Sequence, residues 1–250
     1  MVNTGNKKNR YGLVGKNISY SFSKGYFTQK FADMGLSEHS YENFDLQHIN
    51  EFRELVRNTQ GLKGLNVTIP YKEEVLPFLT EMDKTVEQIG AVNTIKPRGK
   101  ELIGYNTDAF GFQKSLEPFL AKHHTDALIL GTGGASKAVA FVLRQLGITY
   151  RFVSRNPTHD QIRYTDVNAE TVQQYQIIIN CTPLGTFPDV AKKPALPYPF
   201  LNKEHLLYDL IYNPSKTAFL LEGESHGATI CNGLRMLELQ AEKAWDIWNS

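Results

Sequence analysis

A short apolar run followed by a glycine-rich turn is the feature that most constrains the fold of this chain. Ala127-Leu128-Ile129-Leu130 is continuously apolar, as expected for a parallel strand buried on both faces. Gly131-Thr132-Gly133-Gly134-Ala135-Ser136 follows, and apolar residues between 138 and 146 then recur at helical spacing up to Gly147. This order of strand, turn and helix predicts an α/β protein with a doubly wound sheet.

The glycine-rich turn has the form of a dinucleotide-binding loop. Such a loop lets the backbone approach a pyrophosphate, whose charge is met by the N-terminus of the next helix. We expect Gly131 to supply the tight turn and Gly133 the close approach, with Gly134 and Ala135 beside them. Ser136 stands where a third glycine is usual. Glycine-rich turns also occur for purely structural reasons, but the flanking strand and helix favour binding.

The end of the next predicted strand, at residues 150–153, indicates which cofactor is bound. A site for NAD places an acidic residue there to hold the ribose 2′-hydroxyl, yet the first acid is Asp160. Ser154, Arg155 and Asn156 instead offer a guanidinium and two neutral donors, which suit a 2′-phosphate. The sequence therefore favours NADP over NAD, the alternative being that Arg155 is a solvated loop arginine.

Strand and helix signals alternate along the whole chain. Strands are predicted at 11–15, 41–44 and 65–69, with helices at 27–34 (before Gly35), at 49–56 and from Pro70 at a first helical position. A glycine- and proline-containing stretch at 96–100 precedes a second series, with strands at 127–130, 150–153, 177–179, 206–210 and 229–230. The final helix is amphipathic, with an apolar stripe of Leu234, Leu237, Ala241, Trp245 and Trp248.

We therefore expect an α/β protein of two domains. Residues 1–107 would form a substrate-binding catalytic domain, completed by the C-terminal helix at 233–250, and residues 108–232 a Rossmann-type, doubly wound NADP-binding domain.

Composition limits the classes of function. The 27 Lys and Arg nearly balance the 26 Asp and Glu, which argues against nucleic acid or membrane partners held by bulk electrostatics. The two cysteines, Cys181 and Cys231, fit no metal or disulfide pattern, so we expect no metal. The polar, basic first ten residues and the lack of a long apolar run predict a cytoplasmic protein. A near-neutral surface fits a monomer or a homodimer.

Several short polar motifs follow predicted strands, where α/β proteins usually place ligand-binding groups. Their hydroxyls, amides, one lysine and one aspartate can hold a polyhydroxylated small molecule and move one proton. Taken singly each is ordinary, since Asn93 and Asn106 could be turn residues and Ser21 and Ser23 a helix cap. The motifs are Ser19-Tyr20-Ser21-Phe22-Ser23, Asn66-Val67-Thr68-Ile69-Pro70-Tyr71-Lys72, Gly90-Ala91-Val92-Asn93-Thr94 and Gly104-Tyr105-Asn106-Thr107-Asp108.

Taken together, these motifs resemble the shikimate dehydrogenase family. The last three of them occur in order with the glycine-rich turn, with Asn180-Cys181-Thr182-Pro183-Leu184-Gly185 and with Gly233-Leu234-Arg235-Met236-Leu237-Glu238-Leu239-Gln240-Ala241. The resemblance runs from about residue 12 to the end of the chain. It implies reversible reduction of 3-dehydroshikimate to shikimate with NADPH, in the chorismate pathway to aromatic amino acids.

The resemblance also implies roles for individual residues. Ser21 and Ser23 would hold the substrate carboxylate, and Lys72 would serve as a catalytic residue with Asp108. Leu210 and Gly233 would lie by the nicotinamide. The remaining substrate-binding residues would be Asn66, Thr68, Asn93, Tyr212 and Gln240, and Thr182 would join the cofactor-binding set.

The chain also departs from the family pattern. The usual Pro-Ile-x-His-Ser-x-Ser-Pro reads Asn17-Ile18-Ser19-Tyr20-Ser21-Phe22-Ser23-Lys24, which keeps both serines and changes their neighbours. The usual Asn-Arg-Thr reads Ser154-Arg155-Asn156, and His159 stands where a second basic residue is common. Both changes bear on how tightly substrate and NADP are held.

Reduction of a ketone requires a hydride on carbon and a proton on the developing alkoxide. The ammonium of Lys72 can stabilise that charge and donate the proton, and Asp108 can orient the ammonium. A helix N-terminus at Pro70 would disfavour the cation and Asp108 would favour it. The alternative is a surface ion pair worth under about 1 kcal/mol.

Three other functions fit parts of the pattern. A quinate/shikimate dehydrogenase that uses NAD is the nearest, and another NADP-linked reductase with two domains would not need Lys72, Asn93 and Asp108. A non-catalytic NADP-binding sensor could keep the fold, but the retained Lys72 and Asp108 argue against it.

Overall fold

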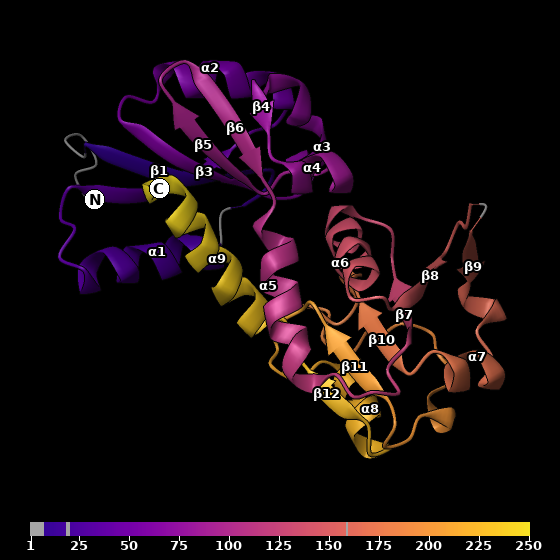
Figure 1. Cartoon of the computed structure of the whole chain (residues 1–250). Helices are drawn as coiled ribbons and strands as arrows, with labels where there is room; N and C mark the ends of the chain where they lie inside the picture. Colours follow the sequence, from indigo (N-terminus) through magenta and orange to yellow (C-terminus); the bar gives the residue numbers. More distant parts are fainter. Residues whose placement is uncertain (1–7, 19–20, 159) are drawn as a thin grey trace. The chain divides into compact units, whose positions relative to one another are not determined.

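The computed structural model describes residues 8–18, 21–158 and 160–250 (Figure 1). The expectations for Ser19, Tyr20, His159 and most of the N-terminal segment concern positions outside these ranges. The chain divides into two compact units, residues 1–107 with 241–250, and residues 108–240. These units differ from the predicted domains in placing residues 233–240 with the second unit.

The first unit contains a mixed six-stranded sheet. Strand β1 is parallel to its neighbours β2 and β3, whereas β5 is antiparallel to both of its neighbours, β3 and β6. The strand order is β2-β1-β3-β5-β6-β4. The strands are β1 (Asn9–Gly15), β2 (His39–Asp45), β3 (Leu62–Val67), β4 (Glu81–Met82), β5 (Thr94–Arg98) and β6 (Glu101–Tyr105), and the helices are α1 (Phe22–Asp33), α2 (Phe52–Asn58), α3 (Tyr71–Glu74), α4 (Lys84–Ile89) and the C-terminal part of α9 (Leu234–Asn249).

Each face of this sheet has its own apolar core. On one face Phe27 and Phe31 of α1 pack with Trp248 of α9, and on the other Phe52 of α2 packs with Val86 of α4. Figure 1 shows α1 and α9 on one side of the sheet and α2 on the other. Gly64 on β3 is required by the first core, because a Cβ there would lie 2.4 Å from the ring of Trp248.

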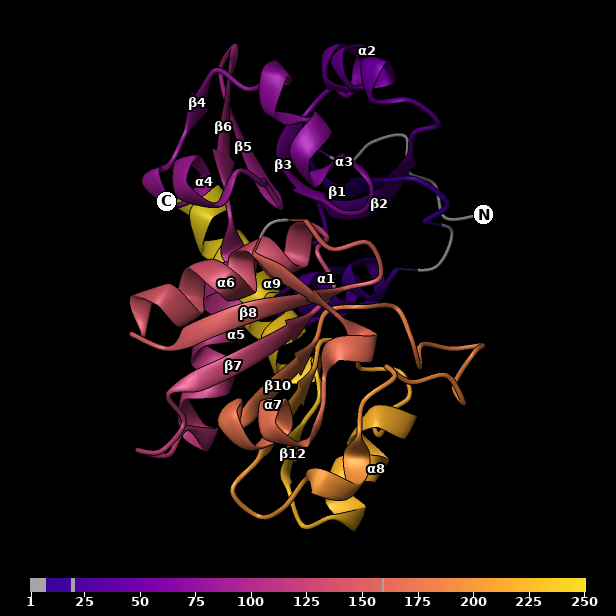
Figure 2. The same cartoon turned by 90° about the vertical axis from the view of Figure 1, so that its right-hand side faces the viewer.

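The second unit confirms the predicted doubly wound sheet. Its six strands are all parallel, in the order β12-β11-β10-β7-β8-β9, and Figure 2 shows β8, β7 and β10 side by side. The strands are β7 (Asp126–Leu130), β8 (Thr149–Ser154), β9 (Gln161–Arg163), β10 (Ile177–Asn180), β11 (Leu206–Asp209) and β12 (Thr229–Cys231), and the helices are α5 (Thr107–Leu116), α6 (Gly134–Gln145), α7 (Ala169–Gln174), α8 (Ala218–Ser225) and the start of α9.

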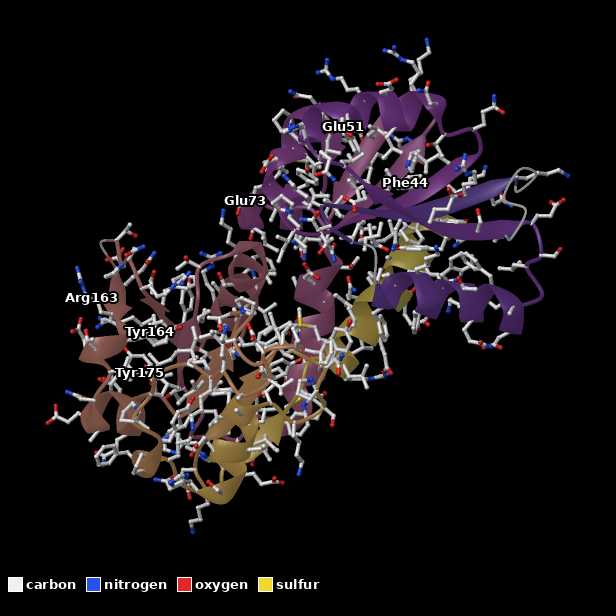
Figure 3. The ribbon with its side chains drawn as sticks, turned by 180° about the vertical axis from the view of Figure 1, so that it is seen from behind. Phe44, Glu51, Glu73, Arg163, Tyr164 and Tyr175 are labelled. Carbon is white, nitrogen blue, oxygen red and sulfur yellow. The ribbon has the colours of Figure 1, made fainter. Side chains whose placement is uncertain are left out.

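Helices cover both faces of the parallel sheet. On one face Val172 of α7 and Phe219 of α8 share a core with the strands, where Tyr175 is buried and Tyr164 packs against it (Figure 3). On the other face Phe112 of α5 meets Tyr208 of β11 edge to face, with ring centroids 5.1 Å apart. Among the described residues, no helix has the length and apolar character needed to cross a bilayer, and no cluster of His, Cys, Asp and Glu is arranged for a metal ion.

Some sequence-based boundaries were wrong. The glycine- and proline-containing stretch at 96–100 is the turn region of the β5–β6 hairpin, where Arg98 pairs with Glu101. The third strand ends at Val67, and Pro70 precedes α3 as its N-cap and is not its first residue. Leu234 is 39% exposed and does not belong to the buried stripe of α9, whereas Met236 is 7% exposed.

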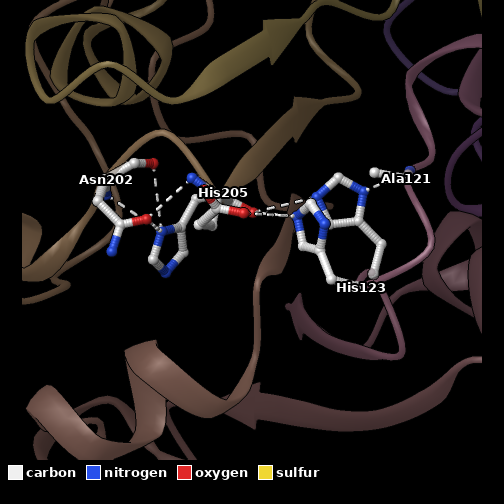
Figure 4. A network of polar contacts seen from close by, with 6 residues as sticks. Ala121, His123, Asn202 and His205 are labelled. Carbon is white, nitrogen blue, oxygen red and sulfur yellow. Dashed lines mark hydrogen bonds and ion pairs between the residues drawn. The ribbon is translucent and has the colours of Figure 1, made fainter.

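A histidine network joins two loops at the amino ends of the parallel strands (Figure 4). The N–H of Ala121 donates to His124 Nδ1, so the proton of this ring is on Nε2, which lies 3.1 Å from the Glu204 carbonyl. His205 likewise accepts from the N–H of Asn202 and donates to the Val172 carbonyl. The His124 ring is therefore bonded in its neutral form.

We expect acid to destabilise the fold through His124. Burial lowers the pKa of this ring, so the folded state favours its neutral form. Its contribution to stability is complete above about pH 6.5, the ordinary histidine value, and is lost as the pH falls below it. Thermal unfolding between about pH 8 and pH 5 should therefore show a smaller loss of Tm in His124→Gln than in the wild type. His48→Gln, at an exposed histidine, is the control, and an unchanged pH dependence in His124→Gln would remove His124 as the cause.

Candidate functional site

Polar residues gather at the carboxyl end of β3 in the first unit. Asn66 is buried at the end of this strand, Thr68 follows it, and Lys72 is the second residue of α3, where its neighbour Glu73 is labelled in Figure 3. The Thr68 carbonyl accepts the N–H of Tyr71, and the Lys72 carbonyl accepts the N–H of Val92 at 2.8 Å. The backbone of the lysine is thus fixed next to the segment that carries Asn93.

Asn93 joins several elements of this unit. Its backbone carbonyl accepts the N–H of Val67 at 2.8 Å, and its own N–H donates to the Tyr105 carbonyl. Its side-chain Oδ1 accepts the N–H of Thr107 at 2.7 Å, and its Nδ2 donates to Thr107 Oγ1 at 2.9 Å. Since the backbone N–H of Thr107 can only donate, it fixes the orientation of the Asn93 amide. Asn93 is 2% exposed, so this amide is held in place at the start of α5.

The two serines lie at the start of α1. Ser21 is the N-cap, and its Oγ accepts the N–H of Lys24 at 3.3 Å, which confirms that it caps a helix. Capping uses the oxygen as an acceptor, so the hydroxyl proton is not consumed by it. Ser23 is buried and hydrogen bonds to Tyr41, whose pKa burial raises above its usual range.

Tyr41 links these serines to the amides. Its hydroxyl donates to Asn66 Oδ1 at 2.7 Å, and Asn66 Nδ2 donates to the Asn93 carbonyl and to Thr94 Oγ1. The first unit therefore brings Ser23, Asn66 and Asn93 into one buried network. Sequence reasoning missed the participation of Tyr41, Thr94 and Thr107. The two threonines stood within recognised motifs, whereas Tyr41 carried no signal beyond its place in a strand.

The other predicted substrate residues belong to the second unit. Asp108 is 6% exposed in the first turn of α5, directly after Thr107. Tyr212 is half-buried in the loop after β11, and Gln240 is half-buried on α9. A Cβ on Gly111 would lie 3.1 Å from Gln240 Cβ, so α5 and α9 approach closely at these positions.

The glycine-rich turn lies between β7 and α6, as predicted. Gly131 has φ +99°, which favours glycine, and Gly133 is the N-cap of α6 with no atom within 4 Å of where its Cβ would be. Gly134 and Ala135 form the first turn of this 12-residue helix. Ser136 is 1% exposed and donates to the Gly133 carbonyl at 2.7 Å, so a serine fits where a third glycine is usual. An open cradle at a helix N-terminus fits the pyrophosphate of a dinucleotide.

The remaining predicted cofactor residues follow the carboxyl ends of neighbouring strands. Ser154 ends β8, and exposed Arg155 and Asn156 come next. Thr182 follows β10, and its methyl group would lie 3.1 Å from a Cβ on Gly131. Leu210 follows β11, and its carbonyl approaches within 2.0 Å of where a Cβ on Gly233 would be, so only glycine fits there. One edge of the parallel sheet thus carries the whole set.

Comparisons with known proteins agree with this geometry. Residues 13–95 match the family model described as shikimate dehydrogenase substrate binding domain. The chain is 36% identical to the shikimate dehydrogenase (NADP(+)) of Caldicellulosiruptor saccharolyticus over 94% of this chain and 90% of that protein. It is 33% identical to the enzyme of the same name from Methanococcus vannielii over 95% of this chain and 90% of that protein.

Similarity extends to solved structures. The shikimate 5-dehydrogenase of Thermus thermophilus, solved in complex with NADP(H) and shikimate, superposes with a TM-score of 0.84. The two are 31% identical, and the match covers 96% of this chain and 93% of that one.

Proposed function

This chain belongs to the shikimate dehydrogenase family, and from that premise we propose a role in the reaction for each of its site residues. It is an NADP-dependent oxidoreductase of the shikimate pathway, which interconverts 3-dehydroshikimate and shikimate. The assignment of individual residues is our proposal, and the anchoring of Lys72 beside the Asn93 segment is the observation that carries it.

The first unit binds the substrate. Ser21 and Ser23 hold its carboxylate. The Ser21 hydroxyl accepts from Lys24 and can donate a charge-assisted hydrogen bond to the carboxylate, whereas the Ser23 hydroxyl turns its single proton from Tyr41 to the carboxylate when the substrate binds. Thr68, Asn66 and Asn93 hold ring oxygens, and Tyr212 and Gln240 are further residues that we assign to the substrate. A buried network that is bonded to both the oxygen and the nitrogen of the Asn93 amide keeps its donors and acceptors in fixed directions. This is the property a site needs in order to select one stereoisomer of a polyhydroxylated ring.

Lys72 delivers the proton. In ketone reduction its ammonium stabilises the alkoxide as charge develops and protonates it, and in the reverse direction the neutral amine accepts the proton. Asp108 is the acidic residue that we assign to catalysis with Lys72. Burial of Asp108 limits the screening of its charge by water, which strengthens any interaction it makes.

The second unit binds NADP. When bound, NADPH supplies the hydride. Gly131, Gly133, Gly134 and Ala135 receive the pyrophosphate, and Ser154, Arg155 and Asn156 hold the 2′-phosphate. Leu210 and Gly233 lie by the nicotinamide, and Thr182 belongs to the same cofactor-binding set.

We expect Lys72→Ala to lower kcat by about 10²- to 10⁴-fold, the usual contribution of a general acid, with little change in the KM for shikimate. Steady-state oxidation of shikimate by NADP measures both constants. Lys63→Ala, at an exposed lysine on β3, serves as the control and should behave as the wild type. Intact turnover in the Lys72 variant would exclude it as the proton donor.

We expect Arg155→Ala to raise the KM for NADPH by about tenfold while leaving the KM for NADH nearly unchanged, because the lost charge-assisted bond is made only to the 2′-phosphate. Initial rates with each nucleotide give the ratio of kcat/KM values. Arg144→Ala, an exposed arginine in the last turn of α6, is the matched control. If Arg155→Ala keeps the wild-type preference for NADPH over NADH, another residue binds the 2′-phosphate.

A further inference from the structure

Asp209, the last residue of β11, is a fully buried carboxylate outside the predicted site. Three neutral groups donate to it. Asn180 Nδ2 and the N–H of Ile211 each lie 3.0 Å from Oδ1, and the hydroxyl of Thr217 lies 2.6 Å from Oδ2. A carboxylate accepts at both oxygens, so it satisfies all three donors at once.

No cation forms an ion pair with Asp209 within the part of the chain that the structure describes. Burial raises the pKa of Asp209 to about 6, against the opposing effect of the three hydrogen bonds. The titratable groups that feel its charge are Cys181, just after β10, and Tyr198, which also faces Glu222 of α8. Burial raises the pKa of both groups, so they are neutral where Asp209 ionises. A buried charge held only by neutral donors is costly, which suggests a role beyond packing.

The first donor connects Asp209 to the loop after β10. With its Nδ2 committed to Asp209, Asn180 presents Oδ1 to Thr182, accepting from the backbone N–H at 3.0 Å and from the hydroxyl at 2.7 Å. Thr182 in turn lies against Gly131 of the glycine-rich turn. The orientation of the Asn180 amide therefore sets the position of Thr182.

The other two donors connect Asp209 to the loop after β11. The N–H of Ile211 fixes the turn immediately after Leu210, and the Ile211 carbonyl accepts the N–H of Gly233 at 3.0 Å. Thr217 is the N-cap of α8, whose Oγ1 accepts the N–H of Leu220 while its proton goes to Asp209. Both ends of the loop that contains Tyr212 are thus tied to one carboxylate.

We propose that Asp209 is a positioning residue for NADP, whose ionised carboxylate holds the loops after β10 and β11 in the arrangement that receives the cofactor. The inference rests on the proposed cofactor roles of Thr182, Leu210 and Gly233. Asp209 acts through these residues and does not itself contact the cofactor.

The charge state of Asp209 matters because of Thr217. An amide, or a protonated acid, presents a donor toward the Thr217 oxygen, which already accepts from Leu220. The Thr217 hydroxyl must then turn its proton away from Asp209 into buried surroundings, where it loses its acceptor. Asp209→Asn therefore reproduces the protonated state without changing the size of the side chain.

Calorimetric titration of the full-length protein with NADP tests the proposal without relying on turnover. At about pH 7.5 we expect Asp209→Asn to raise the Kd for NADP about tenfold, the effect of weakening one charge-assisted network. Thr217→Val should weaken NADP binding in the same direction, and Thr217→Ser, which keeps the hydroxyl, should restore it.

A pH comparison separates positioning from general damage to the fold. At about pH 5.5 most wild-type Asp209 is protonated, so the Kd ratio between Asp209→Asn and the wild type should shrink to about threefold. The titration of NADP itself cancels in this ratio. Tyr208 precedes Asp209 on β11, and its hydroxyl lies 2.6 Å from Ser115 Oγ. Tyr208→Phe is the control for the loss of a buried hydrogen bond, and it should keep the wild-type Kd for NADP.

The proposal is overturned if Asp209→Asn binds NADP as the wild type does, if the Kd ratio is the same at both pH values, or if Tyr208→Phe weakens binding equally. If Asp209→Asn fails to fold, Thr217→Val and Thr217→Ser test the proposal instead. Equal Kd values for NADP in these two variants would overturn it. Lys72→Ala should leave the Kd for NADP unchanged, so the failure of this proposal and of the proposed proton donor are distinguishable.

Discussion

The orientation of one buried amide, that of Asn93, is the constraint on which the candidate substrate site depends. Its Oδ1 must accept the N–H that begins α5, and its backbone carbonyl must accept from Val67 and from Asn66. A buried amide that is bonded at both its oxygen and its nitrogen cannot rotate without leaving polar groups unpaired, at a cost of about 1–3 kcal/mol for each. The ends of β3 and β5 and the first residue of α5 are thereby held in one arrangement. Ser23 joins the same network through Tyr41, so the proposed carboxylate-binding and ring-binding groups are fixed together.

In the parallel sheet of the second unit, the proposed binding residues lie at the carboxyl ends of the strands and a stabilising histidine network lies at the amino ends. The carboxyl ends of its strands carry the glycine-rich turn, Thr182, Leu210 and the buried carboxylate of Asp209, which accepts from Asn180, Ile211 and Thr217. At the amino ends, buried histidines bridge neighbouring segments. This division follows from the topology, because ligands of doubly wound sheets bind where the strand order reverses, here between β7 and β10. The polar groups at the amino ends of the strands then serve mainly to stabilise the fold.

The sequence predicted the parallel sheet well because its signals are local and redundant. Continuous apolar runs identify β7 and β10, and the glycine-rich turn identifies the start of α6. The β5–β6 hairpin was missed because Pro97 and Gly99 are typical of loops. β5 pairs with β3 only at Thr94 and Ile95, so Pro97 lies on an edge, where a missing N–H is tolerated.

The site was predictable only in part. Motifs named Asn66 and Asn93, which the structure joins by a hydrogen bond, but Tyr41 lies 25 residues from Asn66 and its role depends on the packing of β2 beside β1. Asp209 carried no sequence signal either, since its importance comes from three donors on separate segments. Leu234 was predicted to lie on the buried stripe of α9 but is exposed, because helical spacing alone does not show which turns of a helix pack against the rest of the protein.

The most direct test of this account is the initial rate of NADPH formation with shikimate, measured beside quinate and beside NAD. We expect rapid turnover with shikimate and NADP, and much slower turnover when quinate replaces shikimate or NAD replaces NADP. Equal or faster turnover with quinate and NAD would contradict the assigned cofactor preference. The absence of turnover with every pair would contradict catalysis by Lys72 and Asp108 and leave only a binding function for these motifs.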